Sequence, residues 1–124
     1  MEDRPRERRS FARVRIQAPV YFRALTRSDV LRGGAEIEGD LIDAGRGGVA
    51  FRTGFVGLLA GDVIDLGVET FEGERVLSAT FARVVHVVAQ DGVETVSCSF
   101  VVPTPDHAWI VALTGSRIPD SAFA

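Results

Sequence analysis

The sequence contains no lysine, so all fourteen of its basic residues are arginines. A phosphate loop that ends in Gly-Lys-Ser/Thr is therefore excluded. Cys98 is the single cysteine, which excludes an intrachain disulfide. No apolar run approaches the ~20 residues that span a bilayer, and the first ten residues are charged without the apolar core of a secretory signal. We therefore expect a cytoplasmic protein without membrane insertion.

Catalytic and metal-binding patterns are also missing. The two histidines are His86, within a valine-rich stretch, and His107, in the first turn of an expected helix, and neither has a nucleophile patterned around it. There is no Gly-x-Ser-x-Gly elbow and no Cys/His set with the spacing of metal ligands. The sequence predicts that the protein is not an enzyme and holds no metal or cofactor.

The residues that are abundant favour strands and turns. The chain has 124 residues, 46% of them hydrophobic, with 13 glycines and 8 phenylalanines, which suits one all-β domain. Period-two alternation and turn signals, including the Asp91-Gly92 pair, predict strands over 14–25, 36–43, 49–53, 62–69, 75–90 and 93–102. Thr104, Pro105 and Asp106 predict the start of a helix of roughly ten residues that stops at Gly115.

These elements predict a small six-stranded antiparallel β-barrel with one C-terminal α-helix, since barrel closure removes exposed sheet edges. We expect the barrel and helix to occupy residues 14–115. Residues 1–13 are expected to form a flexible Arg-rich segment, and residues 116–124 a frayed tail.

Positive charge is concentrated near the N-terminus. Residues 1–32 hold nine arginines against four acids, a balance of +5, whereas residues 33–124 hold five arginines against thirteen acids, a balance of −8. Arg8, Arg9 and Arg13 lie just before the first strand. A guanidinium group can bind a phosphate through two hydrogen bonds, or the O6/N7 edge of a guanine. A plain solvated tail is the alternative for this cluster.

A second cluster is the stretch DAGRGG, residues 43–48, at the end of an expected strand. The Asp43 carboxylate can accept hydrogen bonds from N1 and N2 of a guanine, and Gly48 allows a ligand to approach the backbone closely. An ordinary hairpin turn is the alternative reading of this stretch.

The combination Arg9-x-x-x-Arg13 and Asp43-x-x-x-x-Gly48, about 30 residues later, resembles the PilZ domain family. That family has Arg-x-x-x-Arg near the N-terminus and Asp/Asn-x-Ser-x-x-Gly on a strand and turn. The resemblance covers roughly residues 8–113 and implies a barrel that binds cyclic di-GMP, the nucleotide second messenger of bacteria. It implies a ligand site of seven residues: Arg8, Arg9, Arg13, Asp43, Gly45, Arg46 and Gly48.

Within this site Gly45 replaces the serine of the family pattern. Loss of the hydroxyl would remove a contact of about 0.5–1.5 kcal/mol, and Arg46 could supply compensating charge. On this reasoning Gly45→Ser should raise the affinity for the ligand. The family further implies that the arginine segment orders over the ligand and that the altered surface acts on a protein partner.

Two other functions stay open at this point. One is a PilZ-like adaptor that acts through protein contacts without binding the nucleotide, which the loss of the serine favours. The other is a nucleic-acid-binding barrel with the arginines on phosphates, which the acidic body and the lack of an evident aromatic platform oppose. We therefore expect no nucleic-acid polymer as a partner.

Overall fold

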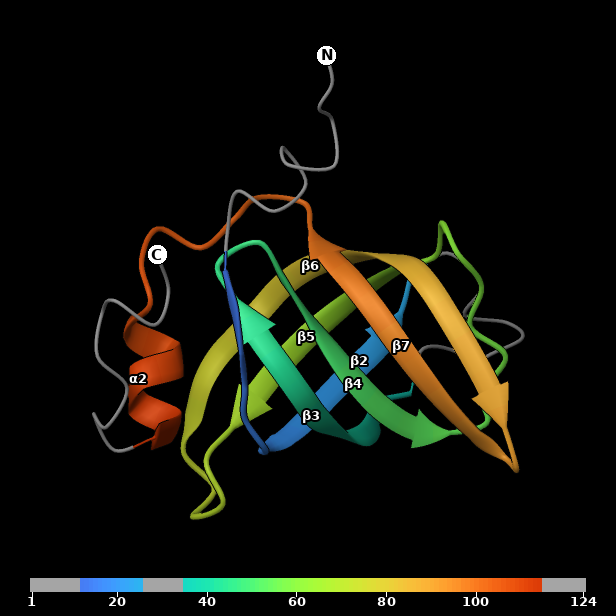
Figure 1. Ribbon diagram of the computed structural model, residues 1–124, viewed down its shortest axis with the longest axis horizontal. Helices are drawn as coiled ribbons and strands as arrows, with labels where there is room; N and C mark the ends of the chain where they lie inside the picture. Colours follow the sequence, from blue (N-terminus) through green and yellow to red (C-terminus); the bar gives the residue numbers. More distant parts are fainter. Residues whose placement is uncertain (1–11, 26–34, 115–124) are drawn as a thin grey trace.

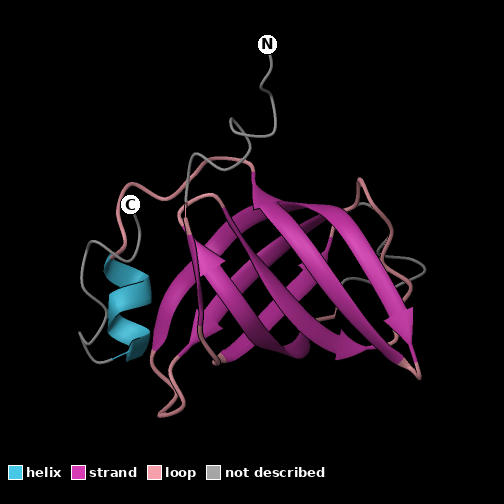
Figure 2. Ribbon diagram, viewed as in Figure 1, coloured by secondary structure: helices cyan, strands magenta, loops and turns pink. Residues whose placement is uncertain are grey.

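The computed structural model of the chain describes residues 12–25 and 35–114. Strands dominate this part of the chain (Figure 2). They are β1 (Arg13–Arg15), β2 (Pro19–Ala24), β3 (Ile37–Gly45), β4 (Gly48–Gly54), β5 (Val63–Glu69), β6 (Arg75–Gln90) and β7 (Val93–Phe100), and they are followed by the helix α2 (Ala108–Thr114).

The strands form one antiparallel sheet that closes on itself. Its order is β1-β3-β2-β5-β6-β7-β4, and a further pairing of β3 with β4 closes the strands β2 to β7 into a barrel (Figure 1). β1 lies outside this ring and pairs with β3 alone. The expected six-stranded barrel with a C-terminal helix is therefore confirmed, with β1 as an additional strand.

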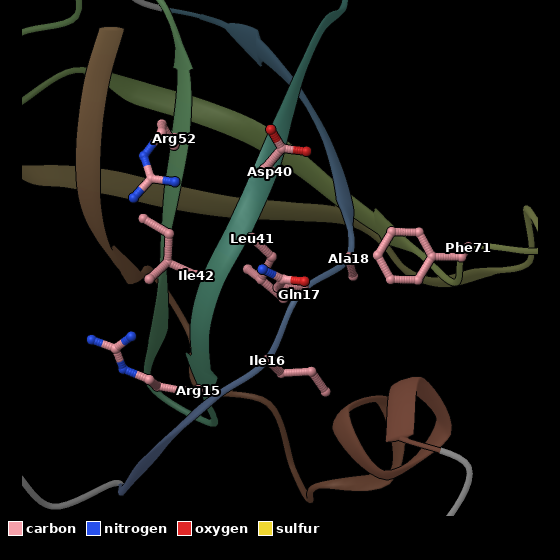
Figure 3. A pocket seen from close by; sticks show the side chains of 9 residues that line it. All are labelled: Arg15, Ile16, Gln17, Ala18, Asp40, Leu41, Ile42, Arg52 and Phe71. Carbon is pink, nitrogen blue, oxygen red and sulfur yellow. The ribbon is translucent and has the colours of Figure 1, made fainter.

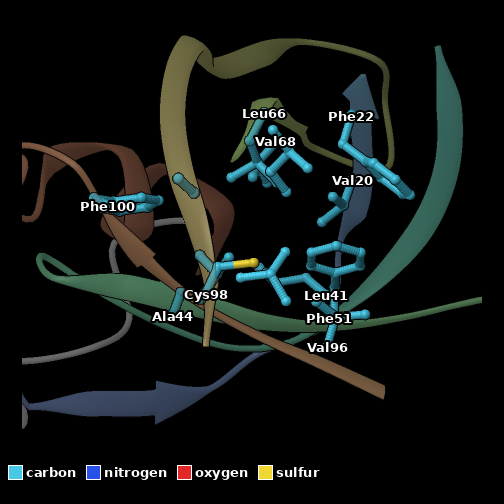
Figure 4. Close-up of a cluster of buried hydrophobic side chains, with 14 of the residues drawn as sticks. Val20, Phe22, Leu41, Ala44, Phe51, Leu66, Val68, Val96, Cys98 and Phe100 are labelled. Atoms are coloured by element: carbon cyan, nitrogen blue, oxygen red, sulfur yellow. The ribbon is translucent and has the colours of Figure 1, made fainter. Parts of the chain in front are cut away.

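The barrel interior is filled by the side chains that the period-two pattern placed on one face of each strand (Figure 4). The Phe22 and Phe51 rings meet in its middle with their centroids 5.0 Å apart. Cys98 is completely buried there. Full burial of each large apolar side chain contributes about 1.5–3 kcal/mol, so this interior is the main source of stability.

The expected single strand over 14–25 is broken in two. Arg15 lies opposite Asp43 and Pro19 lies opposite Asp40, so the three residues 16–18 face the two residues 41 and 42. One extra residue on this side makes a bulge, and Pro19, which has no N–H to donate, begins β2 after it. Both halves still pair with the same edge of β3, and Arg13 belongs to β1 rather than to a flexible segment.

The C-terminal part differs from the sequence prediction in its boundaries. α2 begins at Ala108 rather than at Pro105, because the Asp106 carboxylate accepts a hydrogen bond from the Ala108 N–H at 2.9 Å and so caps the helix. Trp109 is buried as expected and packs against Phe100, with ring centroids 6.3 Å apart. The strand predicted over 93–102 is shorter than expected, because β7 ends at Phe100 and Val102 is 72% exposed.

The β6–β7 hairpin is as predicted. Gln90 pairs with Val93, and the two residues between them, Asp91 and Gly92, have φ angles of 55° and 77°. Two positive φ angles in a two-residue loop are the signature of a type I′ turn, whose twist matches that of the flanking strands.

Candidate functional site

Arg13 and Asp43 come together on the outer surface of the barrel. β1 pairs with the last residues of β3, so that Arg13 lies opposite Gly45 and Arg15 lies opposite Asp43. The Arg13 Nη1 donates to Asp43 Oδ1 at 3.1 Å, and the two side chains are 36% and 29% exposed. The two motifs that the sequence singled out, thirty residues apart, therefore share one place in the fold.

Two glycines let the Arg13 side chain lie flat on the sheet. Arg13 is opposite Gly45, Gly45 is opposite Gly48 and Gly48 is opposite Ser99, so these residues form one row across β1, β3, β4 and β7. A Cβ atom at Gly48 would lie 2.9 Å from the Arg13 Nη2 and would overlap the Cys98 carbonyl oxygen. Glycine at this position therefore leaves room for the Arg13 guanidinium next to the backbone, at the place where the sequence predicted the approach of a ligand.

The space left by Gly48 is used for a hydrogen bond that the sequence did not reveal. The Arg13 Nη2 donates to the carbonyl oxygen of Cys98 at 3.2 Å. This contact crosses β4 to reach β7, and it depends on strand order, which no short motif encodes. Burial raises the pKa of the Cys98 thiol to about 12, although the charge of Arg13 opposes the shift.

Gly45 is buried beneath the backbone of β1. A Cβ atom at this position would overlap the carbonyl oxygen of Ala12 and lie 3.1 Å from the Arg13 Cγ. In this protein the space into which a serine side chain would extend is occupied by the chain itself. The small size of Gly45 thus allows β1 to pack against β3.

Arg46 contacts the segment that leads from β7 to α2. Its Nε donates to the carbonyl oxygen of Thr104 at 2.8 Å, and the Thr104 N–H donates back to the Arg46 carbonyl oxygen at 2.9 Å. These bonds join the β3–β4 turn to the segment between β7 and α2. Arg8 and Arg9 lie outside the described residues, so of the seven expected site residues the structure brings together Arg13, Asp43, Gly45 and Gly48.

A scan against protein-family profiles matches the PilZ domain over residues 7–115. The chain belongs to the PilZ domain family. Members of this family are receptors and adaptors for cyclic di-GMP, and PilZ domains generally bind rather than catalyse. Within residues 12–25 and 35–114 of this PilZ domain, no cluster of three His, Cys, Asp or Glu side chains could hold a metal ion, and no helix is long and apolar enough to cross a membrane.

Solved structures share the fold of this PilZ domain at low sequence identity. The Bacillus subtilis inhibitor of motility MotI/DgrA matches with a TM-score of 0.58 and 14% identity over 88% of this chain and 49% of that protein. The PilZ domain of CeSA from a cellulose-synthesizing bacterium matches with a TM-score of 0.50 and 18% identity over 83% of this chain and 95% of that one. This PilZ domain thus spans about half the length of MotI/DgrA. A search of curated protein sequences found no match.

Proposed function

We propose that this PilZ domain is a cytoplasmic receptor for cyclic di-GMP that binds the ligand on the outer face of β1, β3 and β4. The observation that carries the proposal is the contact of Arg13 with Asp43 at 3.1 Å beside Gly48. A guanidinium can bind a phosphodiester or the O6/N7 edge of a guanine, and a carboxylate can accept hydrogen bonds from the N1 and N2 donors of the same base.

The ligand would replace the Arg13–Asp43 ion pair with two stronger partners. Both side chains are about a third exposed, and ion pairs of this kind contribute only about 0–1 kcal/mol. A phosphate oxygen can take the place of the carboxylate on Arg13, and the N1 and N2 donors of a guanine can take the place of the guanidinium on Asp43. Breaking the pair therefore costs little compared with the hydrogen bonds that the ligand supplies.

The remaining site residues would support ligand binding in different ways. We propose that Arg8 and Arg9 add phosphate contacts from the N-terminal segment, which orders over the bound ligand. Gly45 and Gly48 let β1 and the Arg13 side chain lie close to the sheet, which holds Arg13 beside Asp43. Arg46 carries any movement of the β3–β4 turn to Thr104 and toward α2, which makes α2 the side on which a protein partner would read the bound state.

Calorimetric titration with cyclic di-GMP tests the proposal. Arg13→Ala and Asp43→Ala should each weaken binding by more than about tenfold, since each removes charge-assisted hydrogen bonds. Arg23→Ala is the matched control, because Arg23 lies on β2 and forms an ion pair with Glu36, which precedes β3 at the opposite end of that strand from Asp43. The wild-type melting temperature should also rise with ligand. Absence of heat and of any such rise would refute a receptor role.

One observation favours an adaptor that does not bind the nucleotide. Arg13 and Asp43 satisfy each other, and the backbone of β1 covers Gly45, where the family pattern has a serine. If the titration is negative while the protein still binds a partner protein at the α2 side, the adaptor function replaces the receptor function.

A further inference from the structure

Two more arginines lie beside Asp43 on the same outer face. Arg15 is directly opposite Asp43 in the β1–β3 pairing. Arg52 is on β4, opposite Asp40 in the β3–β4 pairing, and two residues from Ala50, which is opposite Asp43. Figure 3 shows the guanidinium groups of Arg15 and Arg52 on the same side of β3, with Ile42 between them.

These side chains border a groove that the β1–β2 bulge opens. The groove has a volume of about 550 Å³, and its lining includes Arg15, Gln17, Asp40, Ile42 and Arg52. Ile42 is the extra residue of a second bulge, in β3 between Leu41 and Asp43, and its side chain is half-buried. The groove is therefore an irregular, mostly polar depression, and Arg15, which is opposite Asp43 in the β1–β3 pairing, lies at its border.

The two guanidinium groups are available for an anion. Both residues are exposed, and neither forms an ion pair or a side-chain hydrogen bond with the part of the chain that the structure describes. Asp40 lies opposite Arg52 in the sheet but no ion pair joins them. With Arg13, three arginines face the two carboxylates of Asp40 and Asp43, so this face carries a positive excess on a barrel whose sequence is acidic.

We propose that Arg15 and Arg52 bind a phosphate of the cyclic dinucleotide in this groove. The inference rests on the proposed function and adds a second anion contact to it. The ligand carries two phosphates. Arg13 is opposite Gly45, at the β3–β4 turn end of the site, whereas Arg15 is opposite Asp43 and Arg52 is opposite Asp40, farther from that turn. Two planar guanidinium forks with the Ile42 side chain between them suit a phosphodiester and its adjoining ribose.

Four variants and one control test this inference by calorimetry. Arg15→Ala and Arg52→Ala should each weaken cyclic di-GMP binding by about tenfold to a hundredfold, and Arg15→Lys and Arg52→Lys should restore part of the loss. Arg23→Ala removes the same charge from β2, next to Glu36 and away from the groove, and this variant should bind cyclic di-GMP as the wild type does. All five should melt within about a degree of the wild type, apart from the small loss of the Arg23 pair.

A second ligand separates a phosphate contact from a base contact. Phosphate contacts position a nucleotide without reading its base. Arg15→Ala and Arg52→Ala should therefore leave the ratio of cyclic di-GMP to cyclic di-AMP affinity unchanged, whereas Asp43→Ala should lower this ratio.

The outcomes distinguish the two proposals. If the wild type binds and Arg13→Ala does not, while Arg15→Ala and Arg52→Ala bind like Arg23→Ala, the second anion contact is wrong and the receptor function stands. If Arg15→Ala or Arg52→Ala changes the affinity ratio between the two ligands, the contact is to a base and the inference is wrong. If the wild type shows no binding, the receptor function and this inference are both overturned.

Discussion

Gly45→Ser is the substitution for which the family motif and the structure predict opposite effects on ligand affinity. The family pattern alone predicts a gain in affinity, because a missing hydroxyl is restored. The structure predicts the reverse, because a Cβ atom at Gly45 overlaps the Ala12 carbonyl oxygen and lies 3.1 Å from the Arg13 Cγ. Either β1 leaves β3 or the two strands shift apart.

The size of the effect follows from what holds β1 in place. β1 has three residues and three register pairs with β3, and Arg13 adds hydrogen bonds to Asp43 and Cys98. Inserting atoms into such a close contact costs about 1–3 kcal/mol. For a domain of this size that loss corresponds to a fall in melting temperature of roughly 3–15 °C. The affinity for cyclic di-GMP should fall as well, because Arg13 is displaced from Asp43.

Differential scanning calorimetry of Gly45→Ser measures the fall in melting temperature, and ligand titration measures the loss of affinity. Gly54→Ser is the matched control, since a Cβ atom at Gly54 has no other atom within 4 Å. The reasoning is refuted if Gly45→Ser melts with the wild type, or if it binds the ligand more tightly than the wild type does.

Four further predictions follow from single residues. Arg13→Ala should lower the free energy of unfolding by about 0.5–1.5 kcal/mol in denaturant titrations, because it removes the bonds to Asp43 and Cys98; no loss would mean that β1 is held without them. Gly92→Ala should destabilise by about 1 kcal/mol, since Gly92 has a φ of 77°, and an unchanged unfolding midpoint would contradict the type I′ turn. Ala79→Gly should stabilise by about 0.5–1 kcal/mol, because Ala79 has a φ of 51° in a bulge of β6, and a destabilised variant would disprove strain there. Burial raises the pKa of the Cys98 thiol from 9.0 to about 12. The thiol should therefore resist a disulfide reagent at pH 8 in the folded protein and react on denaturation, and rapid labelling of the folded protein would show that it is accessible. The contribution of the thiol to the free energy of unfolding should be constant below pH 9 and decline as the pH rises from 9 toward 12.

The barrel was predictable because its strands obey simple local rules. Val20 and Phe22 alternate with polar neighbours, and Asp91-Gly92 demands a tight turn, so these signals need no knowledge of the rest of the chain. The bulge between β1 and β2 was not predictable, because the apolar period of two continues from Val14 to Phe22 without interruption. An extra residue relative to a partner strand is visible only when the partner is known.

The contacts among the expected site residues were only partly predictable. The resemblance to the PilZ family implied that Arg13 and Asp43 share a ligand site, which stays a prediction, and the structure shows that the two side chains form an ion pair. The bond from Arg13 to the Cys98 carbonyl, and that from Arg46 to Thr104, connect strands and turns that are distant in sequence. They arise from the order β3-β4-β7 around the barrel, which local patterns do not specify.

The link between the β3–β4 turn and the segment before α2 makes the intrinsic tryptophan fluorescence of the protein sensitive to the position of that turn. Trp109 is the single tryptophan, and its indole Nε1 donates to Thr104 Oγ1 at 3.3 Å. Thr104 is also the residue that Arg46 holds, so a displacement of the turn reaches the indole through one intervening residue. The intrinsic fluorescence of the unlabelled chain should therefore change in wavelength or intensity when a ligand moves the turn, and stopped-flow emission would time that movement without any attached dye.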